Sequence, residues 1–353
     1  MEYKKQLADL ISVVVRESAS DLHLSVGRNP IIRVSGFLIP LLKMPLLTEK
    51  DLDGFLDEIL SPENKKTFLE TKEIDFSYAF AESARFRGNG FYQRGVVGVA
   101  LRLIPQEIRT LQELNLPAIL ESFTQKAQGF FLVVGPVGHG KSTTLATMIE
   151  TINQERLEHI ITIEDPIEYV YKNKKSIIDQ REVRLDTRSF HTALVSAFRQ
   201  DVDVIMIGEM RGLDTVATAV TAAETGHLVF STLHTNSAAQ TIERIIDSFP
   251  ASQQGQIRLQ LSTSLTGIFS QRLIPRISGG LIPAYELLIN NNAVANLIRE
   301  KRIQEINTII ETSSGQGMID MSRSLADLVR RGEITVENAY LYSINPKTLE
   351  KLI

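Results

Sequence analysis

The feature that most constrains the fold is the run Gly135–Ser142, which matches the phosphate-loop pattern G-x-x-x-x-G-K-[ST] in full. An apolar stretch over 129–134 precedes it, and a helical pattern follows. Such a loop turns backbone N–H groups and a helix N-terminus towards phosphate. A glycine-rich turn with an accidental lysine is the alternative, which this context disfavours. The predicted nucleotide site consists of Gly135, Pro136, Val137, Gly138, His139, Gly140, Lys141, Ser142 and Thr143.

Four residues in and beyond this run carry the expected chemistry. Lys141 supplies positive charge to the β- and γ-phosphates of ATP, and the Ser142 hydroxyl is a ligand for Mg²⁺. Glu164 and Glu209 each follow an apolar run, at the strand ends where ligands of α/β sheets gather. We expect Glu209 to hold the metal through water and Glu164 to polarise the attacking water. Exposed strand-end acids are the alternative for both.

Composition places the chain among soluble globular proteins. Its 353 residues have room for two domains, and the absence of cysteine excludes disulfides and thiolate metal sites. The 38 basic and 42 acidic residues give a net charge of −4, and there is no tryptophan, so nothing favours a nucleic-acid partner or a DNA motor. Because no apolar run is long enough to span a membrane, we expect a cytoplasmic protein.

The pattern of apolar residues divides the chain at a short polar segment. Residues 1–104 alternate between strand and helix signals and predict a small α+β domain, and 105–117 form the predicted linker. In 118–353, apolar runs separated by helical stretches predict an α/β domain with a doubly wound, mostly parallel sheet. The predicted buried strands are 129–134, 159–163, 202–207 and 227–233. Beyond about residue 255 we expect mostly helix.

Two arginines of the first domain are predicted to face each other. If Arg94 and Gly95 form the tip of a two-residue hairpin, Arg87 lies directly opposite Arg102. Like charges at such positions are unfavourable by roughly 0.2–1 kcal/mol, and an anion between them would reverse the sign. A solvated strand face is the alternative. His227 and His234, on either side of the run 228–233, are by themselves explained as ordinary histidines at a sheet edge.

Several longer motifs resemble those of the secretion and type IV pilus ATPases, and of their retraction branch in particular. The resemblance covers almost the whole chain, and its motifs occur in the family's order. They are Ala19–Leu24, Arg85–Arg87, the phosphate loop, Thr162–Tyr169, Gln180–Val183, Gly208–Arg211 and Thr225–Thr235. The missing cysteines also favour the retraction branch, because assembly-type relatives usually carry a four-cysteine zinc element. Departures from the usual pattern are His139, Val202, Gly212 and Ala295.

This resemblance implies a PAS-like first domain, a RecA-like ATPase domain with a helical C-terminal part, and a homohexameric ring. It implies that Glu164 is the catalytic base and Glu209 the Walker B acid, with His227 and His234 near the γ-phosphate. Arg87 and Arg102 match arginines that reach the nucleotide at a subunit boundary. The implied function is ATP-driven extraction of pilin at an inner-membrane platform protein, on the cytoplasmic face. Pilus assembly, type II secretion or an accessory retraction role are the alternatives.

Overall fold

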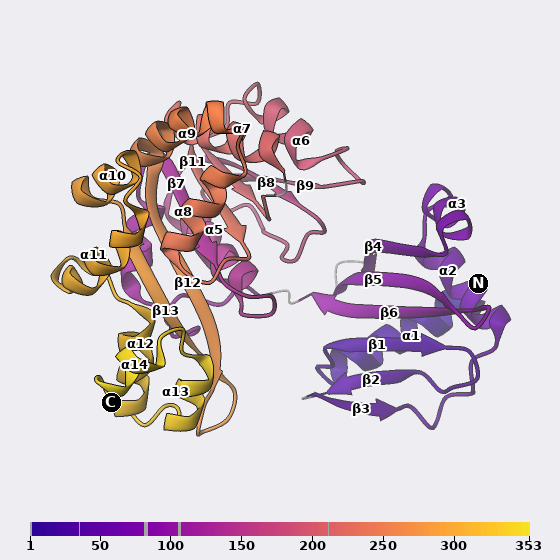
Figure 1. Ribbon diagram of the computed structural model, residues 1–353. Coiled ribbons are helices and arrows are strands. Elements are labelled where there is room, and N and C mark those ends of the chain that lie inside the picture. Colours follow the sequence, from indigo (N-terminus) through magenta and orange to yellow (C-terminus); the bar gives the residue numbers. More distant parts are fainter. Residues whose placement is uncertain (1, 35, 81–83, 105–106, 211) are drawn as a thin grey trace. The chain divides into compact units, whose positions relative to one another are not determined.

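The computed structural model describes residues 2–34, 36–80, 84–104, 107–210 and 212–353 (Figure 1). The chain forms two compact units. One contains residues 1–107 with 166–170, and the other contains 108–165 with 171–353. Pro105 and Gln106 of the predicted linker, and Arg211 of the predicted Walker B motif, lie outside the described residues.

The smaller unit is an antiparallel six-stranded sheet with helices packed against it. The strand order is β3-β2-β1-β6-β5-β4. Apolar residues of the helices and of alternate strand positions form one hydrophobic core. The strands are β1 (Asp21–Ser25), β2 (Ile31–Val34), β3 (Phe37–Pro40), β4 (Glu73–Phe80), β5 (Ala84–Gln93) and β6 (Val96–Ile104), and the helices are α1 (Glu2–Arg16), α2 (Glu49–Ile59) and α3 (Pro62–Thr71).

Local signals in the sequence set the ends of these elements. Thr48 caps α2 in a capping box with Asp51, and Ser61 caps α3, whose first residue is Pro62. Arg94 and Gly95 both have positive φ, as the turn of a two-residue hairpin requires. The β5–β6 register pairs position 87 with position 102, which confirms the predicted hairpin.

The larger unit is built on a seven-stranded sheet of order β13-β12-β7-β11-β10-β8-β9. All neighbouring pairs are parallel except β12 with β13. The four predicted buried strands are confirmed as β7, β8, β10 and β11. The strands are β7 (Gly129–Val134), β8 (His159–Glu164), β9 (Ile177–Glu182), β10 (Val204–Ile207), β11 (Leu228–Leu233), β12 (Leu265–Pro275) and β13 (Leu281–Ile289).

Both faces of this sheet are buried, which explains the continuous apolar runs. Along β7, Phe130, Leu132 and Val134 join one large core with the helices of that face, whereas Phe131 packs against Phe123 on the other. The surrounding helices are α4 (Glu121–Thr124), α5 (Lys141–Glu155), α6 (Phe190–Ala197), α7 (Leu213–Glu224), α8 (Ala238–Asp247) and α9 (Ala251–Ser264).

The prediction of mostly helix beyond residue 255 is wrong for 265–289. There β12 and β13 form a long antiparallel pair that extends the central sheet (Figure 1). Polar residues at 270–272 interrupt the apolar pattern of β12, and strand pairing with β7 overrides that local signal. Helices follow as expected: α10 (Asn292–Arg299), α11 (Ile306–Thr312), α12 (Met321–Arg330), α13 (Val336–Tyr342) and α14 (Pro346–Glu350). In the described part of the chain, no helix is long and apolar enough to cross a membrane.

Candidate nucleotide-binding site

The phosphate loop joins the carboxyl end of β7 to the first residue of α5, Lys141. Its glycines adopt backbone conformations that other residues rarely do, with φ of 144° at Gly135, 81° at Gly138 and 80° at Gly140. A Cβ on Gly135 would lie 2.3 Å from the backbone oxygen of Gln271 in β12. Glycine is therefore required at 135 both for its φ and because β12 passes so close to the loop.

Lys141 brings the loop together with two of the predicted site residues. Its side chain is buried, and Nζ donates to the backbone oxygens of Gly135 at 2.9 Å and Pro136 at 2.8 Å. The same Nζ lies 3.2 Å from Nδ1 of His234. Because an ammonium has no acceptor, Nδ1 must accept this bond, which leaves the ring proton on Nε2. That Nε2 lies 3.5 Å from Oε2 of Glu209, so Lys141, His234 and Glu209 form one connected group.

Strand order explains how distant segments supply this group. The loop follows β7, His234 follows β11 and Glu209 follows β10, and these three parallel strands are neighbours in the sheet. Glu164 ends the next strand, β8. At about 4.8 Å between strands, β8 lies roughly 14 Å from β7 and β10 roughly 10 Å from it. The predicted acids therefore share the carboxyl edge of the sheet with the loop, and Glu209 is the nearer one.

Glu164 is 5% exposed and held by side chains rather than by solvent. Its Oε1 accepts hydrogen bonds from Oγ1 of Thr162 at 2.7 Å and from Nε2 of Gln180 at 3.2 Å. An exposed strand-end acid was the alternative explanation for Glu164, and its burial excludes that explanation. The two donors fix the direction in which the carboxylate faces.

His227 lies at the opposite end of β11 from His234. Its Nδ1 is 3.0 Å from the backbone oxygen of Ala222, and its ring packs against Phe198. Because β11 is parallel to β7, with Leu228 beside Gly129 and Leu233 beside Val134, position 227 is at the edge of the sheet remote from the loop. Six strand residues correspond to about 20 Å. The structure does not bring His227 to the group formed by Lys141, His234 and Glu209.

Arg87 and Arg102 lie side by side in the smaller unit, but acidic side chains accompany them. Nε of Arg102 donates to Oδ1 of Asp21 at 2.9 Å, and Nη1 of Arg87 lies 3.9 Å from Oε1 of Glu168. Burial favours the neutral form of Asp21, yet hydrogen bonds from Ser20 and Arg102 outweigh it and lower the pKa of Asp21. The cross-strand repulsion predicted for Arg87 and Arg102 is thus partly relieved by a carboxylate of the same chain.

Two side chains connect the loop to β12. His139 belongs to the predicted loop, whereas sequence reasoning missed Gln271. Nδ1 of His139 accepts a hydrogen bond from the backbone N–H of Leu273 at 2.9 Å, so its ring faces β12. Burial and the nearby charges of Arg272 and Lys141 lower the pKa of His139, so the ring is neutral at pH 7. Gln271, 3% exposed, bonds to the loop and to α5. Its only signal in the sequence is its place among the polar residues 270–272 that interrupt the apolar pattern of β12.

This fold and this loop define a P-loop ATPase. Residues 97–281 match the family described as "Type II/IV secretion system protein". The chain is 44% identical over 333 residues to the type IV pilus retraction ATPase PilT of Pseudomonas aeruginosa, covering 94% of this chain and 96% of the relative. It is 40% identical to the type IV pilus ATPase PilU of the same organism, covering 100% of this chain and 91% of that one.

A solved structure gives the same result for the fold. The crystal structure of the pilus retraction motor PilT with bound ADP superposes with a TM-score of 0.91 at 48% identity, covering 97% of this chain and 98% of that one. The chain therefore belongs to the Type II/IV secretion system protein family, as a PilT-like pilus retraction ATPase.

Proposed function

We propose that the chain hydrolyses ATP at the loop 135–143 and uses the energy to drive pilus retraction. The observation that carries the assignment is the connected group of Lys141, His234 and Glu209 at the carboxyl edge of the sheet. A cation, a histidine and a carboxylate next to a phosphate loop are the groups that phosphoryl transfer needs for charge neutralisation and positioning. The ADP bound by the solved PilT structure supports a nucleotide as the ligand.

Each side chain has a proposed role that its contacts support. Lys141 and the loop N–H groups bind the β- and γ-phosphates. His234 contacts Lys141 through Nδ1 and faces Glu209 with its Nε2 proton, so it holds these two side chains in fixed positions relative to each other. Glu164, oriented by Thr162 and Gln180, is the proposed general base. His227 is left out of this set because its contacts, to Ala222 and Phe198, are at the other end of β11.

The oxygen ligands near the loop fit a magnesium ion. Ser142 is exposed in the first turn of α5, and Glu209 is connected to Lys141 of the loop through His234. Among the described residues, no three histidine, aspartate or glutamate side chains form a site that could hold a metal alone. Mg²⁺ usually keeps several waters and takes few protein ligands, so Ser142, with Glu209 through water, suffices to hold it. When bound, the ion neutralises charge on the phosphates.

We further propose that residues 1–104 are a PAS-like domain, 118–353 a RecA-like ATPase domain, and 105–117 their linker. The antiparallel sheet of the first and the mostly parallel sheet of the second support this assignment. In the proposed homohexamer, Arg87 and Arg102 reach the nucleotide of a neighbouring subunit. The proposed partner is an inner-membrane platform protein, from which the ring extracts pilin while lying on the cytoplasmic face.

An accessory role in retraction is the second candidate, and it rests on one observation. Identity to PilU, at 40% over the whole chain, is close to the 44% found for PilT. Complementation separates the two. A principal motor restores twitching to a strain that lacks its retraction ATPase, whereas an accessory ATPase restores it only when a principal one is present.

The proposed function is tested by Mg²⁺-dependent ATP hydrolysis of the purified chain and of Lys141→Ala. We expect the variant to lose ADP binding and hydrolysis together, because Lys141 supplies the charge at the phosphates and also closes the loop on itself. Hydrolysis by Lys141→Ala at the wild-type rate would show that ATP is not turned over at this loop. The same variant is the negative control for complementation.

A further inference from the structure

The side chain of Gln271 joins the phosphate loop to the helix that follows it. Nε2 donates to the backbone oxygen of His139 at 3.0 Å, and Oε1 accepts from Oγ1 of Thr144 at 2.6 Å. Gln271 and Thr144 are 3% and 1% exposed, so the bond between them is shielded from water. One amide therefore holds the loop and the first turn of α5 together, from a strand that is more than a hundred residues away in sequence.

These contacts allow only one orientation of the amide. The His139 carbonyl can only accept, so the NH₂ group must face it. Turning the amide over would set Oε1 against that carbonyl and leave the carbonyl without its donor, which is unfavourable. A second hydrogen bond joins β12 to the loop, because the backbone N–H of Leu273 donates to Nδ1 of His139.

The bond to His139 also fixes a donor in the loop. In a planar trans peptide the carbonyl and the following N–H point in opposite directions. Because the His139 oxygen is held towards β12, the N–H of Gly140 points away from β12. A Cβ on Gly140 would lie 2.9 Å from Nε2 of Gln271, so this approach also depends on the glycine.

We propose that Gln271 is a positioning residue for nucleotide binding. It holds the His139–Gly140 peptide in the orientation in which the Gly140 N–H serves the phosphate site, before nucleotide arrives. This inference rests on the proposed function, that nucleotide binds at the loop. Gln271 acts through the loop backbone and Thr144, without contact to the nucleotide or to the reacting atoms.

The test is the Kd for ADP, with Mg²⁺, of Gln271→Met, which keeps the length of the side chain but not its hydrogen bonds. Losing one preorganised donor should raise Kd about tenfold. The same variant should raise KM for ATP by a similar factor with little change in kcat, because the binding lost is common to ground and transition states. An unchanged Kd and KM would overturn the proposal.

Thr266→Val is the matched control. Thr266 lies at the other end of β12, where its Oγ1 donates to the Phe130 oxygen at 3.0 Å, so the variant also removes a bond between β12 and β7. We expect both variants to lower the melting temperature and only Gln271→Met to weaken ADP binding. Equal loss of ADP affinity in both would mean that Gln271 acts through strand stability alone, and would refute the proposal.

Two other variants test the proposal if the Gln271→Met chain does not fold. Thr144→Val removes the donor to Oε1 from the other side and should weaken ADP binding several-fold, whereas an unchanged Kd would overturn the proposal. Gln271→Glu gives an independent readout, because only its protonated form can donate to His139. Its Kd should approach that of wild type as pH falls. If wild-type protein binds no ADP, the proposed function fails instead of this inference.

Discussion

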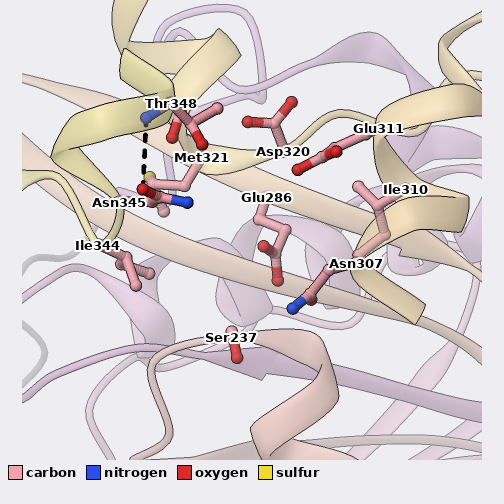
Figure 2. A pocket seen from close by; sticks show the side chains of 11 residues that line it. Ser237, Glu286, Asn307, Ile310, Glu311, Asp320, Met321, Ile344, Asn345 and Thr348 are labelled. Atoms are coloured by element: carbon pink, nitrogen blue, oxygen red, sulfur yellow. Dashed lines mark hydrogen bonds between the residues drawn. The ribbon is translucent and has the colours of Figure 1, made fainter. Parts of the chain in front are cut away.

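Glu286 gives the clearest quantitative prediction, because a carboxyl group is buried there beside other acids. It lies in β13 and is 7% exposed, and its Oε1 accepts the backbone N–H of Ala238 at 2.7 Å. Glu286 lines a cavity of about 250 Å³. Figure 2 shows its side chain between Asp320 and Glu311 on one side and Ser237 on the other. Burial raises the pKa of Glu286 from 4.5 to about 7. The hydrogen bond from Ala238 and the charge of Arg272 lower this pKa, and repulsion from Asp320 raises it.

The raised pKa makes the stability of the larger unit depend on pH. The folded state holds the proton of Glu286 more tightly than the unfolded chain does. The resulting contribution to the free energy of unfolding is complete below pH 4.5 and is lost as pH rises through about 7. At 1.36 kcal/mol per pKa unit, the whole loss is about 3 kcal/mol, of which about 2 kcal/mol falls between about pH 5.5 and pH 8.5.

Glu286→Gln should remove this dependence, because the amide oxygen still accepts from Ala238 and no charge forms. Relative to wild type, the free energy of unfolding of the variant is expected to increase by about 2 kcal/mol when the pH is raised from about 5.5 to 8.5. Urea unfolding followed by hydrogen exchange in 238–247 and 281–289 measures the larger unit by itself. Glu311→Gln, at an exposed residue of the same cavity, is the control and should keep the wild-type pH dependence. If Glu286→Gln changed the free energy of unfolding by the same amount at both pH values, titration of Glu286 would not be the cause of the pH dependence.

Three further predictions concern the nucleotide site. Glu164→Gln should lower kcat by about a hundredfold or more and leave the Kd for ADP unchanged, and an unaltered kcat would remove Glu164 as the base. Inactive Arg87→Ala chains mixed with wild type should depress ATPase activity beyond simple dilution, whereas activity proportional to the wild-type fraction would argue against a role across subunits. Gly135→Ala should lower the melting temperature far more than Gly138→Ala, since both have positive φ but only a Cβ at 135 meets neighbouring backbone; equal losses would contradict this.

Local signals in the sequence were enough for several parts of the structure. The loop pattern and the apolar runs around it placed β7 and α5, because a strand buried on both faces carries no polar positions. Arg94 and Gly95 fixed the register that pairs Arg87 with Arg102, because a two-residue turn leaves only one alignment of its strands. Thr48 and Ser61 cap their helices through hydrogen bonds to their own neighbours, so these two helix starts depend on local sequence.

Other parts depended on contacts between distant segments. The strand β12 was missed because its polar residues at 270–272 hide the strand pattern, which pairing with β7 overrides. The strand β13 then pairs with β12. Asp21 beside Arg102 follows from the pairing of β1 with β6, which no local pattern announces.

The phosphate loop, the four buried strands β7, β8, β10 and β11, and the acids Glu164 and Glu209 at strand ends could be predicted from the sequence, because those properties depend on neighbours within a few residues. The tertiary structure decided which of these residues meet. Sheet order and parallel direction bring His234 and Glu209 to Lys141 and leave His227 about 20 Å away along the same strand. Side-chain contacts across a parallel sheet depend on strand order. Parallel strands are joined by long connections, so the local sequence does not determine that order.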